Sequence, residues 1–329
     1  MTSAPLWITE KEVTSAVALP DAMDALERIL MMEGDGKAKN MTKAHLMVAE
    51  NDAMHALGAS AEGAGLCGFK TWINVRGKSE TIVSLFSLED GALKAIIEAT
   101  ALGQLRTAAM TGVGTRRMAV EKAEDMAIIG TGKQALPQIG ACNIARPLKR
   151  LRVYSRNAEN RGALVQTIKK QFDFEVVDAT SLNEAVDGAQ IITLVTNATQ
   201  PFLTSDMVFP GTHINAMGAI VPARVEFTED IFSRCDLIAV DNQENIRNLS
   251  AEFRSYYGED EERWSKLLTI GKVISQDLKR PPEADLTLFK AMGMGLSDLA
   301  VAIEVYSRIS KEGVSHKVPE RIKLPPRLR

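Results

Sequence analysis

The sequence of 329 residues is poor in the residues that build covalent or metal-bound frameworks. Its three cysteines, Cys67, Cys142 and Cys235, are far apart in the chain, which predicts free thiols in a reducing compartment and argues against a disulfide framework. Its four histidines form no pair at helical or hairpin spacing, and no Cys-x-x-Cys motif is present. We therefore expect no metal site.

The sequence also lacks an excess of one charge and any long apolar run. A formal net charge of −3 argues against a nucleic-acid-binding protein, which would usually have a strong basic excess. No apolar stretch reaches the length needed to cross a bilayer, and the N-terminal MTSAPLWITEKEV has no basic segment followed by an apolar one. We expect a cytoplasmic protein with no nucleic-acid or membrane partner.

What the sequence does contain is an alternation of two kinds of segment between Asp125 and Asp241. Short apolar or β-branched runs (MAIIG, LRVYS, FEVVDA, IITLV, HINAM and LIAVD) are separated by helical patterns such as NAENRGALVQTIKKQF. Such runs are typical of strands that are buried on both faces. Strands separated by helices imply a parallel sheet with right-handed crossovers. This part is predicted to be an α/β, doubly wound Rossmann sheet.

The first 120 residues predict a second, α+β unit. ITEKEVTSAV and LPDAMDALERILMMEGDG have helical patterns, and AHLMVAE, AMHALGASAE, GLCGFKTWINV and TIVSLFSLEDGALKAIIE read as strands. The Asp-Gly in LEDGAL is a hairpin signal, so the sheet is expected to be antiparallel. Past residue 290, GLSDLAVAIEVYSRISKEG predicts a helix, and the basic, proline-rich tail is expected to lie on the surface.

The stretch AIIGTGKQALPQIG carries a Gly-x-Gly-x-x-Ala pattern directly after the first predicted Rossmann strand. Gly130 allows a tight turn, Gly132 lets the backbone approach a pyrophosphate, and Ala135 keeps the helix close to the sheet. The anion would lie at the helix N-terminus, where unpaired N–H groups favour negative charge. The predicted cofactor residues of this turn are Gly130, Thr131, Gly132, Lys133, Gln134 and Ala135.

The segment after the second strand bears on the identity of the dinucleotide. An NAD enzyme usually has an acidic residue there, but this chain has Ser155, Arg156 and Asn157, which suit a 2′-phosphate. We predict NADP(H) in preference to NAD(H), which stays possible; the alternative is that Arg156 is only a surface residue at the start of the next helix. Thr196, Asn197 and Ala198 follow another strand and are expected near the nicotinamide half.

Two basic residues of the first unit are candidate substrate ligands. Lys70 lies in the apolar strand CGFKTW, and Arg106 is expected just before a helix rich in small residues. Arg106 is suited to bind a carboxylate bidentately. For Lys70, a side chain that pairs with a carboxylate and one that only extends to solvent are equally good interpretations, and for Arg106 a structural salt bridge is an equally good alternative.

These segments together resemble the ornithine cyclodeaminase/mu-crystallin family along nearly the whole chain. The matching motifs are GFK, LRTAA, IIGTGKQA, HINAMGA and LTLFKAMGMGLSDLA. The resemblance implies a discontinuous substrate-binding and dimerisation domain (1–120 with 297–329), a Rossmann domain (121–296) and a homodimer. It also implies that Lys70 and Arg106 hold the substrate carboxylate. We add Met217, Gly218 and Gly293 to the predicted cofactor site. The resemblance implies that the glycine-rich turn of Gly293 lies near the nicotinamide. For Ser297 and Asp298, which follow that turn, ordinary helix capping is an equally good explanation.

Two positions depart from the family pattern. The strand that supplies a further basic carboxylate ligand has no arginine here, so Lys43 or His45 would have to serve. Cyclodeaminases and the related alanine dehydrogenases carry an aspartate shortly after the Gly-Ala of NAMGA, where this chain has Ile220. An isoleucine neither accepts a proton nor pairs with an ammonium group, and ketimine reductases of the family also lack the aspartate.

The interpretation is therefore NADPH-dependent reduction of an α-imino acid to the L-amino acid, with Lys70 and Arg106 as catalytic residues. The leading substrates are cyclic ketimines such as pyrroline-2-carboxylate or piperideine-2-carboxylate. Three alternatives stay open. They are reductive amination or imine reduction of a small keto acid (the alanine dehydrogenase or iminosuccinate reductase type), ornithine cyclisation by a lyase, and non-catalytic ligand binding.

Overall fold

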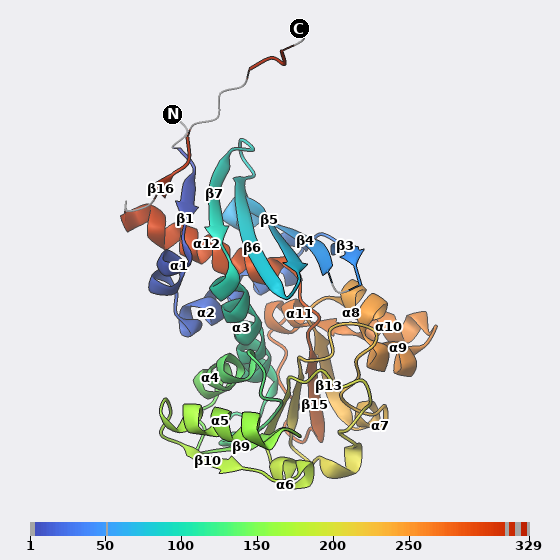
Figure 1. Cartoon of the computed structure of the whole chain (residues 1–329). Helices are drawn as coiled ribbons and strands as arrows, with labels where there is room; N and C mark the ends of the chain where they lie inside the picture. The colour runs from blue at the N-terminus through green and yellow to red at the C-terminus, as the bar shows by residue number, and fades with distance from the viewer. Residues whose placement is uncertain (1–3, 51, 313–315, 320–323, 328–329) are drawn as a thin grey trace.

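The computed structural model describes residues 4–50, 52–312, 316–319 and 324–327, which form two β-sheets joined by long helices. Figure 1 shows the sheets at opposite ends of the molecule, with helix α3 running between them. The N-terminal sheet has the order β16 (His316–Lys317), β1 (Leu6–Ile8), β7 (Leu93–Glu98), β6 (Lys78–Ser87), β5 (Leu66–Val75), β4 (Asp52–Ala61) and β2 (Ala38–Asn40), with β3 (Ala44–Ala49) also on β4.

The N-terminal sheet is antiparallel, as predicted, except that β1 and β7 run parallel. One face packs against α1 (Glu10–Ala16), α2 (Leu19–Gly34), α3 (Thr100–Met118) and α12 (Gly295–Glu312), around a shared apolar core. The opposite face leaves large apolar side chains exposed on β3, β4, β5 and β6. This face has a hollow of about 640 Å³.

The Rossmann sheet has the order β10 (Glu175–Asp178), β9 (Arg150–Tyr154), β8 (Asp125–Ile129), β11 (Ile191–Leu194), β12 (His213–Ala216), β15 (Leu286–Lys290), β13 (Cys235–Val240) and β14 (Leu268–Thr269). All neighbouring strands are parallel, which confirms the predicted fold class. The other helices are α4 (Ala135–Ala145), α5 (Ala158–Lys169), α6 (Leu182–Val186), α7 (Asp230–Ser233), α8 (Gln243–Leu249), α9 (Ala251–Tyr257), α10 (Glu261–Lys266) and α11 (Ile270–Ser275), with short 3₁₀ turns at Glu62–Ala64 and Ser205–Met207.

Strands β14 and β15 are the elements of the Rossmann sheet that the alternation pattern missed. That pattern ends at Asp241, yet Leu286–Lys290 pairs with β12 on one side and β13 on the other. Four helices separate β13 from β15 along the chain. Its position in the sheet therefore depends on contacts between distant segments, which periodicity in a short window does not report.

Helix α3 begins earlier than expected, so Arg106 lies inside the helix and not before it. The start of α3 is capped from a distant element, because the Glu10 carboxylate accepts hydrogen bonds from the backbone N–H groups of Thr100 and Ala101. The small residues of α3 serve close packing. A Cβ on Gly112 would lie 2.5 Å from Met23, and one on Gly114 would lie 2.5 Å from Phe289.

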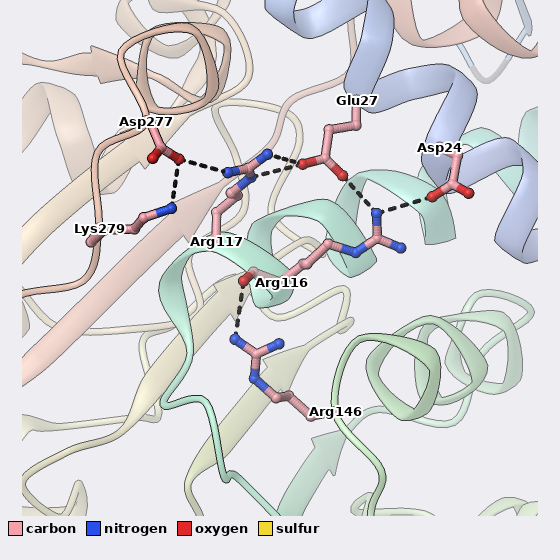
Figure 2. Close-up of polar contacts among 7 residues, drawn as sticks. All are labelled: Asp24, Glu27, Arg116, Arg117, Arg146, Asp277 and Lys279. Atoms are coloured by element: carbon pink, nitrogen blue, oxygen red, sulfur yellow. Dashed lines mark hydrogen bonds and ion pairs between the residues drawn. The ribbon is translucent and has the colours of Figure 1, made fainter.

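The end of α3 is held by a polar network that joins it to α2 and to the helices of the Rossmann unit (Figure 2). Arg116 Nη1 lies 2.6 Å from Glu27 Oε2, and Arg117 Nε donates to Glu27 Oε1 at 2.7 Å. Arg117 also reaches Asp277, in the segment after α11, at 3.4 Å. Arg146, at the end of α4, donates to the Arg116 carbonyl at 3.0 Å. The network fixes α3 against α2 on one side and the Rossmann unit on the other.

None of the helices in the described part of the chain is both long and apolar enough to span a membrane.

Candidate functional site

The glycine turn after β8 has the geometry of a dinucleotide-binding turn. Gly130 has φ +114°, and a Cβ there would lie 2.6 Å from the Val195 carbonyl oxygen, so only glycine fits. A Cβ on Gly132 would meet nothing within 4 Å, so its backbone faces open space. Helix α4 then starts at Ala135, with Pro137 in its first turn, where no intrahelical N–H bond is lost.

The turn's backbone groups suit an anion. Gly130 N–H donates to the Tyr154 carbonyl at 2.9 Å and ties the turn to β9. In the described residues, no protein group accepts a hydrogen bond from the N–H of Gly132, Lys133 or Gln134. These N–H groups lie at the N-terminus of α4, where the helix dipole favours negative charge. A pyrophosphate therefore fits this turn.

The segment after β9 carries the three residues predicted to bind the 2′-phosphate. Asn157 caps α5 by accepting a hydrogen bond from Asn160 N–H at 2.9 Å, and Ser155 Oγ accepts one from Asn157 N–H at 3.4 Å. The Ser155 carbonyl accepts a hydrogen bond from Arg161 at 2.9 Å, which stabilises the turn. Arg156 is exposed and has no ion-pair partner in the described residues. It is free to bind an added anion.

The loops after β11 and β12 meet on a buried carboxylate that the sequence interpretation overlooked. Glu226 accepts hydrogen bonds from Thr196, which is in the loop with Asn197 and Ala198, and from Gly218 and Ala219 in the next loop. Met217, before that loop, is almost completely buried. The sequence signal that could have identified Glu226 is a single acidic residue in the mostly apolar segment VPARVEF.

The loop between β15 and α12 brings the Rossmann sheet to the cationic residues of the N-terminal unit. Asp241, at the end of β13, accepts hydrogen bonds from Met292 N–H at 3.0 Å and Gly293 N–H at 2.6 Å. Burial raises the pKa of Asp241 to about 6, against the opposing effect of these hydrogen bonds and of Arg106. A Cβ on Gly293, whose φ is +90°, would lie 3.3 Å from Arg106 Nη1. The guanidinium thus packs directly on this loop.

Lys70 and Arg106 converge on one carboxylate. Lys70 Nζ lies 3.0 Å and Arg106 Nε 3.3 Å from Asp298 Oδ1, and Asp298 is 1% exposed. Ser297 is not the N-cap that the capping interpretation expected, although Asp298 does lie in the first turn of the helix. Helix α12 begins at Gly295, and Ser297 Oγ donates back to the Met294 carbonyl at 2.7 Å.

An aromatic ladder lies beside these cations. The Trp72 ring stacks on His55 with centroids 4.5 Å apart, and the ammonium groups of Lys70 and Lys43 lie 4.9 and 5.8 Å from the Trp72 centroid. Both candidates for the third basic ligand lie at this cluster: Lys43 lies over Trp72, and the exposed His45 stacks on His55 with ring centroids 6.2 Å apart. Burial, and then the charge of Arg106, lowers the pKa of Lys43.

The electrostatics of Lys70 reflect two opposing influences. Burial lowers the pKa of its ammonium group, and Arg106 and Lys43 add to that effect. Asp298 acts in the opposite direction, through its charge and its hydrogen bond. Lys70 and Arg106 share the single carboxylate of Asp298, and Lys43 lies nearby. These groups together leave net positive charge in the cluster, in which Arg106 packs on the Gly293 loop. That charge can bind a carboxylate beside a nicotinamide.

No group of three or more His, Cys, Asp or Glu side chains in the described residues is arranged to hold a metal ion.

Comparisons with known proteins agree with the predicted family. The model of the ornithine cyclodeaminase/mu-crystallin family matches residues 5–313. Delta(1)-pyrroline-2-carboxylate reductase from Bacillus cereus is 29% identical over 239 residues, which make up 72% of this chain and 73% of that protein. Ketimine reductase mu-crystallin from Macropus fuliginosus is 30% identical over 227 residues, 69% of this chain and 68% of that protein.

The same fold is found in solved structures. The iminosuccinate reductase of Paracoccus denitrificans, in complex with NAD+, has a TM-score of 0.89 to this chain at 23% identity, with 97% of this chain and 100% of that chain covered. The family match extends over the Rossmann sheet, the N-terminal sheet except β16, and the segments that link them. The chain therefore belongs to the ornithine cyclodeaminase/mu-crystallin family.

Proposed function

We propose that this protein reduces an α-imino acid, with a cyclic ketimine such as pyrroline-2-carboxylate or piperideine-2-carboxylate as substrate and NADPH as reductant. One observation carries the proposal. Asp298 holds Lys70 and Arg106 together, and Arg106 packs on the loop of Gly293 that extends from the carboxyl edge of the Rossmann sheet. The names of the relatives, pyrroline-2-carboxylate reductase and ketimine reductase, support the same chemistry.

The chain's own residues would act mainly by positioning. The bound cofactor supplies a hydride to the imine carbon. Lys70, Arg106 and Lys43 bind the carboxylate on that carbon, which orients the C=N bond toward the cofactor. As the new C–H bond forms, the C=N electron pair moves to nitrogen, so a protonated imine becomes the neutral amine without a further proton. Ile220 offers no carboxylate for amine chemistry, which disfavours the cyclodeaminase and alanine dehydrogenase reactions.

NADP(H) is the preferred cofactor in this proposal. Arg156 is exposed and unpaired in the described residues, next to a turn that is held in place by Asn157 and Arg161. A guanidinium there can form charge-assisted hydrogen bonds with a 2′-phosphate. The relative with NAD+ bound gives the competing expectation. The ratio of kcat/KM for NADPH and NADH decides between them, and a tenfold preference for NADH would contradict the proposal.

A second candidate is reduction of a dicarboxylic imine such as iminosuccinate. Lys43 favours it, because this cation has no ion-pair partner in the described residues and lies beside the site. A monocarboxylate would leave Lys43 as a third ligand of the same carboxylate, whereas a dicarboxylate would give it a partner of its own.

The proposed function is tested with a panel of substrates followed at the absorbance band of NADPH. Cyclic ketimines, iminosuccinate, and keto acids with ammonia are compared at equal enzyme concentration. Cyclic ketimines are expected to give the highest kcat/KM. Activity near background with both ketimines, together with rapid turnover of another imine, would refute the substrate assignment. Cofactor binding without reduction of any imine would instead favour a ligand-binding protein.

We also propose a homodimer that covers the apolar face of the N-terminal sheet. Leu46, Met54, Phe69, Ile73 and Ile82 are all at least 39% exposed there. An apolar surface this extensive is typical of an interaction site. A second copy of this chain can cover this face without any other protein.

A further inference from the structure

We propose that Glu226 is a positioning residue for hydride transfer, because its carboxylate ties together the two loops that support the nicotinamide half of the cofactor. The inference rests on the proposed cofactor site and adds a residue that no motif marks. Glu226 itself is fully buried, so it acts through the loops and not by contact with the substrate.

The carboxylate accepts four hydrogen bonds, two from each loop. Oε1 accepts from Thr196 N–H at 2.7 Å and from Thr196 Oγ1 at 2.8 Å. Oε2 accepts from Gly218 N–H at 2.9 Å and from Ala219 N–H at 3.0 Å. The two loops follow β11 and β12, which are adjacent strands of the Rossmann sheet. One side chain therefore sets the separation of the two loops at the sheet's carboxyl edge, where dinucleotides bind.

The surroundings leave these loops little freedom. A Cβ on Gly218 would lie 2.3 Å from both Glu226 Oε1 and Thr196 N, so the loops are in contact at this point. Val195, directly before Thr196, packs against Gly130 of the glycine turn, as the 2.6 Å approach of its carbonyl oxygen to a Cβ there shows. The position of the Thr196 loop is thus coupled to the turn that would hold the pyrophosphate.

Glu226 is itself anchored from a third segment. Its backbone N–H donates to Glu252 Oε1 at 3.2 Å, and Lys290 Nζ lies 3.7 Å from the same oxygen. Ser250 Oγ donates to Glu252 Oε2 at 2.8 Å. Lys290 is the last residue of β15, so these contacts extend from the loop after β11 across to β15, with Glu226, Glu252 and Lys290 buried and Thr196 and Gly218 partly exposed. A buried carboxylate is unfavourable unless several donors satisfy it, and here the donors all belong to the loops or their anchor.

The carboxylate's chemistry makes the role testable by an isosteric change. In Glu226→Gln the amide oxygen can still accept the hydrogen bonds of one loop, but the amide NH₂ faces the donors of the other loop and cannot accept them. One loop is then released while the shape of the side chain is kept. Thr196→Val leaves the backbone N–H bond but removes the hydroxyl, which donates to Glu226 and accepts from Ala198 N–H at 3.2 Å, so it should have a smaller effect of the same kind.

The experiment compares four forms of the full-length protein: wild type, Glu226→Gln, Thr196→Val and Leu148→Ala. Leu148 is buried in the Rossmann core, far in sequence from both loops, and its truncation supplies a destabilised control. NADPH and NADH affinities are measured by nucleotide fluorescence without substrate. Steady-state kinetics with the best imine and the primary isotope effect with 4-deuterated cofactor follow.

The expected result is a slower chemical step with little change in cofactor affinity. For Glu226→Gln, kcat should fall at least about tenfold and the isotope effect should rise, whereas cofactor Kd changes less than about threefold. Thr196→Val should lose about two- to fivefold in kcat, and Leu148→Ala should keep the wild-type kcat and isotope effect despite a lower Tm. Glu226→Gln kinetics equal to those of Leu148→Ala would overturn the inference. Absence of cofactor binding in the wild type would overturn the proposed function first, and this inference with it.

Discussion

Asp298 contacts both cations of the candidate substrate site, at 3.0 Å from Lys70 and 3.3 Å from Arg106, and is almost completely buried. It separates two like charges that would otherwise repel each other, and it opposes the effect of burial on the Lys70 ammonium. Neither function is visible in the motif GMGLSDLA, where helix capping is the simpler explanation. The partner residues lie on β5 and α3, far from α12 in sequence.

Replacement of Asp298 by Asn should therefore change both stability and pH dependence. Removal of one partner from a buried ion pair lowers the free energy of unfolding by about 3–5 kcal/mol. Without the carboxylate the pKa of Lys70 falls, so Lys70 loses its proton at lower pH and the alkaline limb of kcat/KM shifts to lower pH. Asp277→Asn, at an exposed ion pair, is the control and should leave the profile unchanged. An unmoved alkaline limb in Asp298→Asn would contradict this role.

His213 gives a second prediction at the residue scale, for stability. Its ring is fully buried between Thr287 Oγ1 at 2.9 Å and Asn215 Oδ1 at 3.0 Å, and burial lowers its pKa to about 3. The unfolded chain, with a histidine pKa of about 6.5, binds more protons between these values. His213 therefore contributes stability that is fully present above about pH 6.5 and declines as the pH falls toward 3.

The test is a comparison of unfolding curves for the wild type and His213→Gln from pH 4 to 7. The wild type should lose stability faster on acidification, by up to about 1.4 kcal/mol per pH unit. Asp241, whose raised pKa of about 6 acts in the opposite direction, is present in both proteins and cancels in the difference. If the wild type and His213→Gln lost stability equally on acidification, His213 would not titrate as a buried neutral ring.

At the scale of elements, the glycine turn was predictable and the start of α3 was not. The turn depends on residues next to each other: β8, Gly130, Gly132 and the first turn of α4. The start of α3 depends on Glu10, about ninety residues away, and β15 enters the sheet through pairings with β12 and β13. Local chemistry is readable in a short window of sequence, but pairings between distant segments are not.

The two glycines of the turn should respond differently to alanine. Gly132→Ala adds a methyl group in open space, so the fold should keep its Tm while cofactor affinity falls at least about tenfold, because the methyl blocks the pyrophosphate. Gly130→Ala places a Cβ 2.6 Å from the Val195 carbonyl at positive φ. That change should destabilise the protein by about 1–3 kcal/mol. Thermal unfolding and nucleotide titration measure both, and unchanged cofactor affinity in Gly132→Ala would argue against a nucleotide at this turn.

At the scale of the whole molecule, the family and the fold class were predicted correctly, and the chain's two sheets lie at opposite ends of the molecule with α3 between them. The cationic cluster assembles only in three dimensions, since Lys70, Arg106 and Asp298 come from β5, α3 and α12. Sequence reasoning identified the two cations from their own segments and then from the family resemblance, but it missed Glu226, whose partners are loops. The domain boundaries at 120 and 297 stay a prediction.

The exposed apolar face makes a prediction about assembly. Ile82 is 39% exposed on β6, beside Phe69 and Ile73, so an aspartate there would place charge in the proposed dimer interface. Ile82→Asp should shift the mass measured by light scattering from two chains to one, and Tm should fall because the folded chain loses the stabilisation by its partner. Lys78→Asp, at the exposed start of β6, is the control. A wild-type protein that is monomeric at micromolar concentration would contradict the proposed dimer.

The most direct test of the account is a crystal structure of the protein with NADPH and the amino-acid product of the best ketimine. We expect the pyrophosphate at Gly132, the 2′-phosphate at Arg156, and the product carboxylate on Lys70 and Arg106. The nicotinamide C4 should lie about 3–3.5 Å from the product's α-carbon, as hydride transfer requires. A glycine turn without nucleotide, or a product bound away from Lys70 and Arg106, would contradict the account.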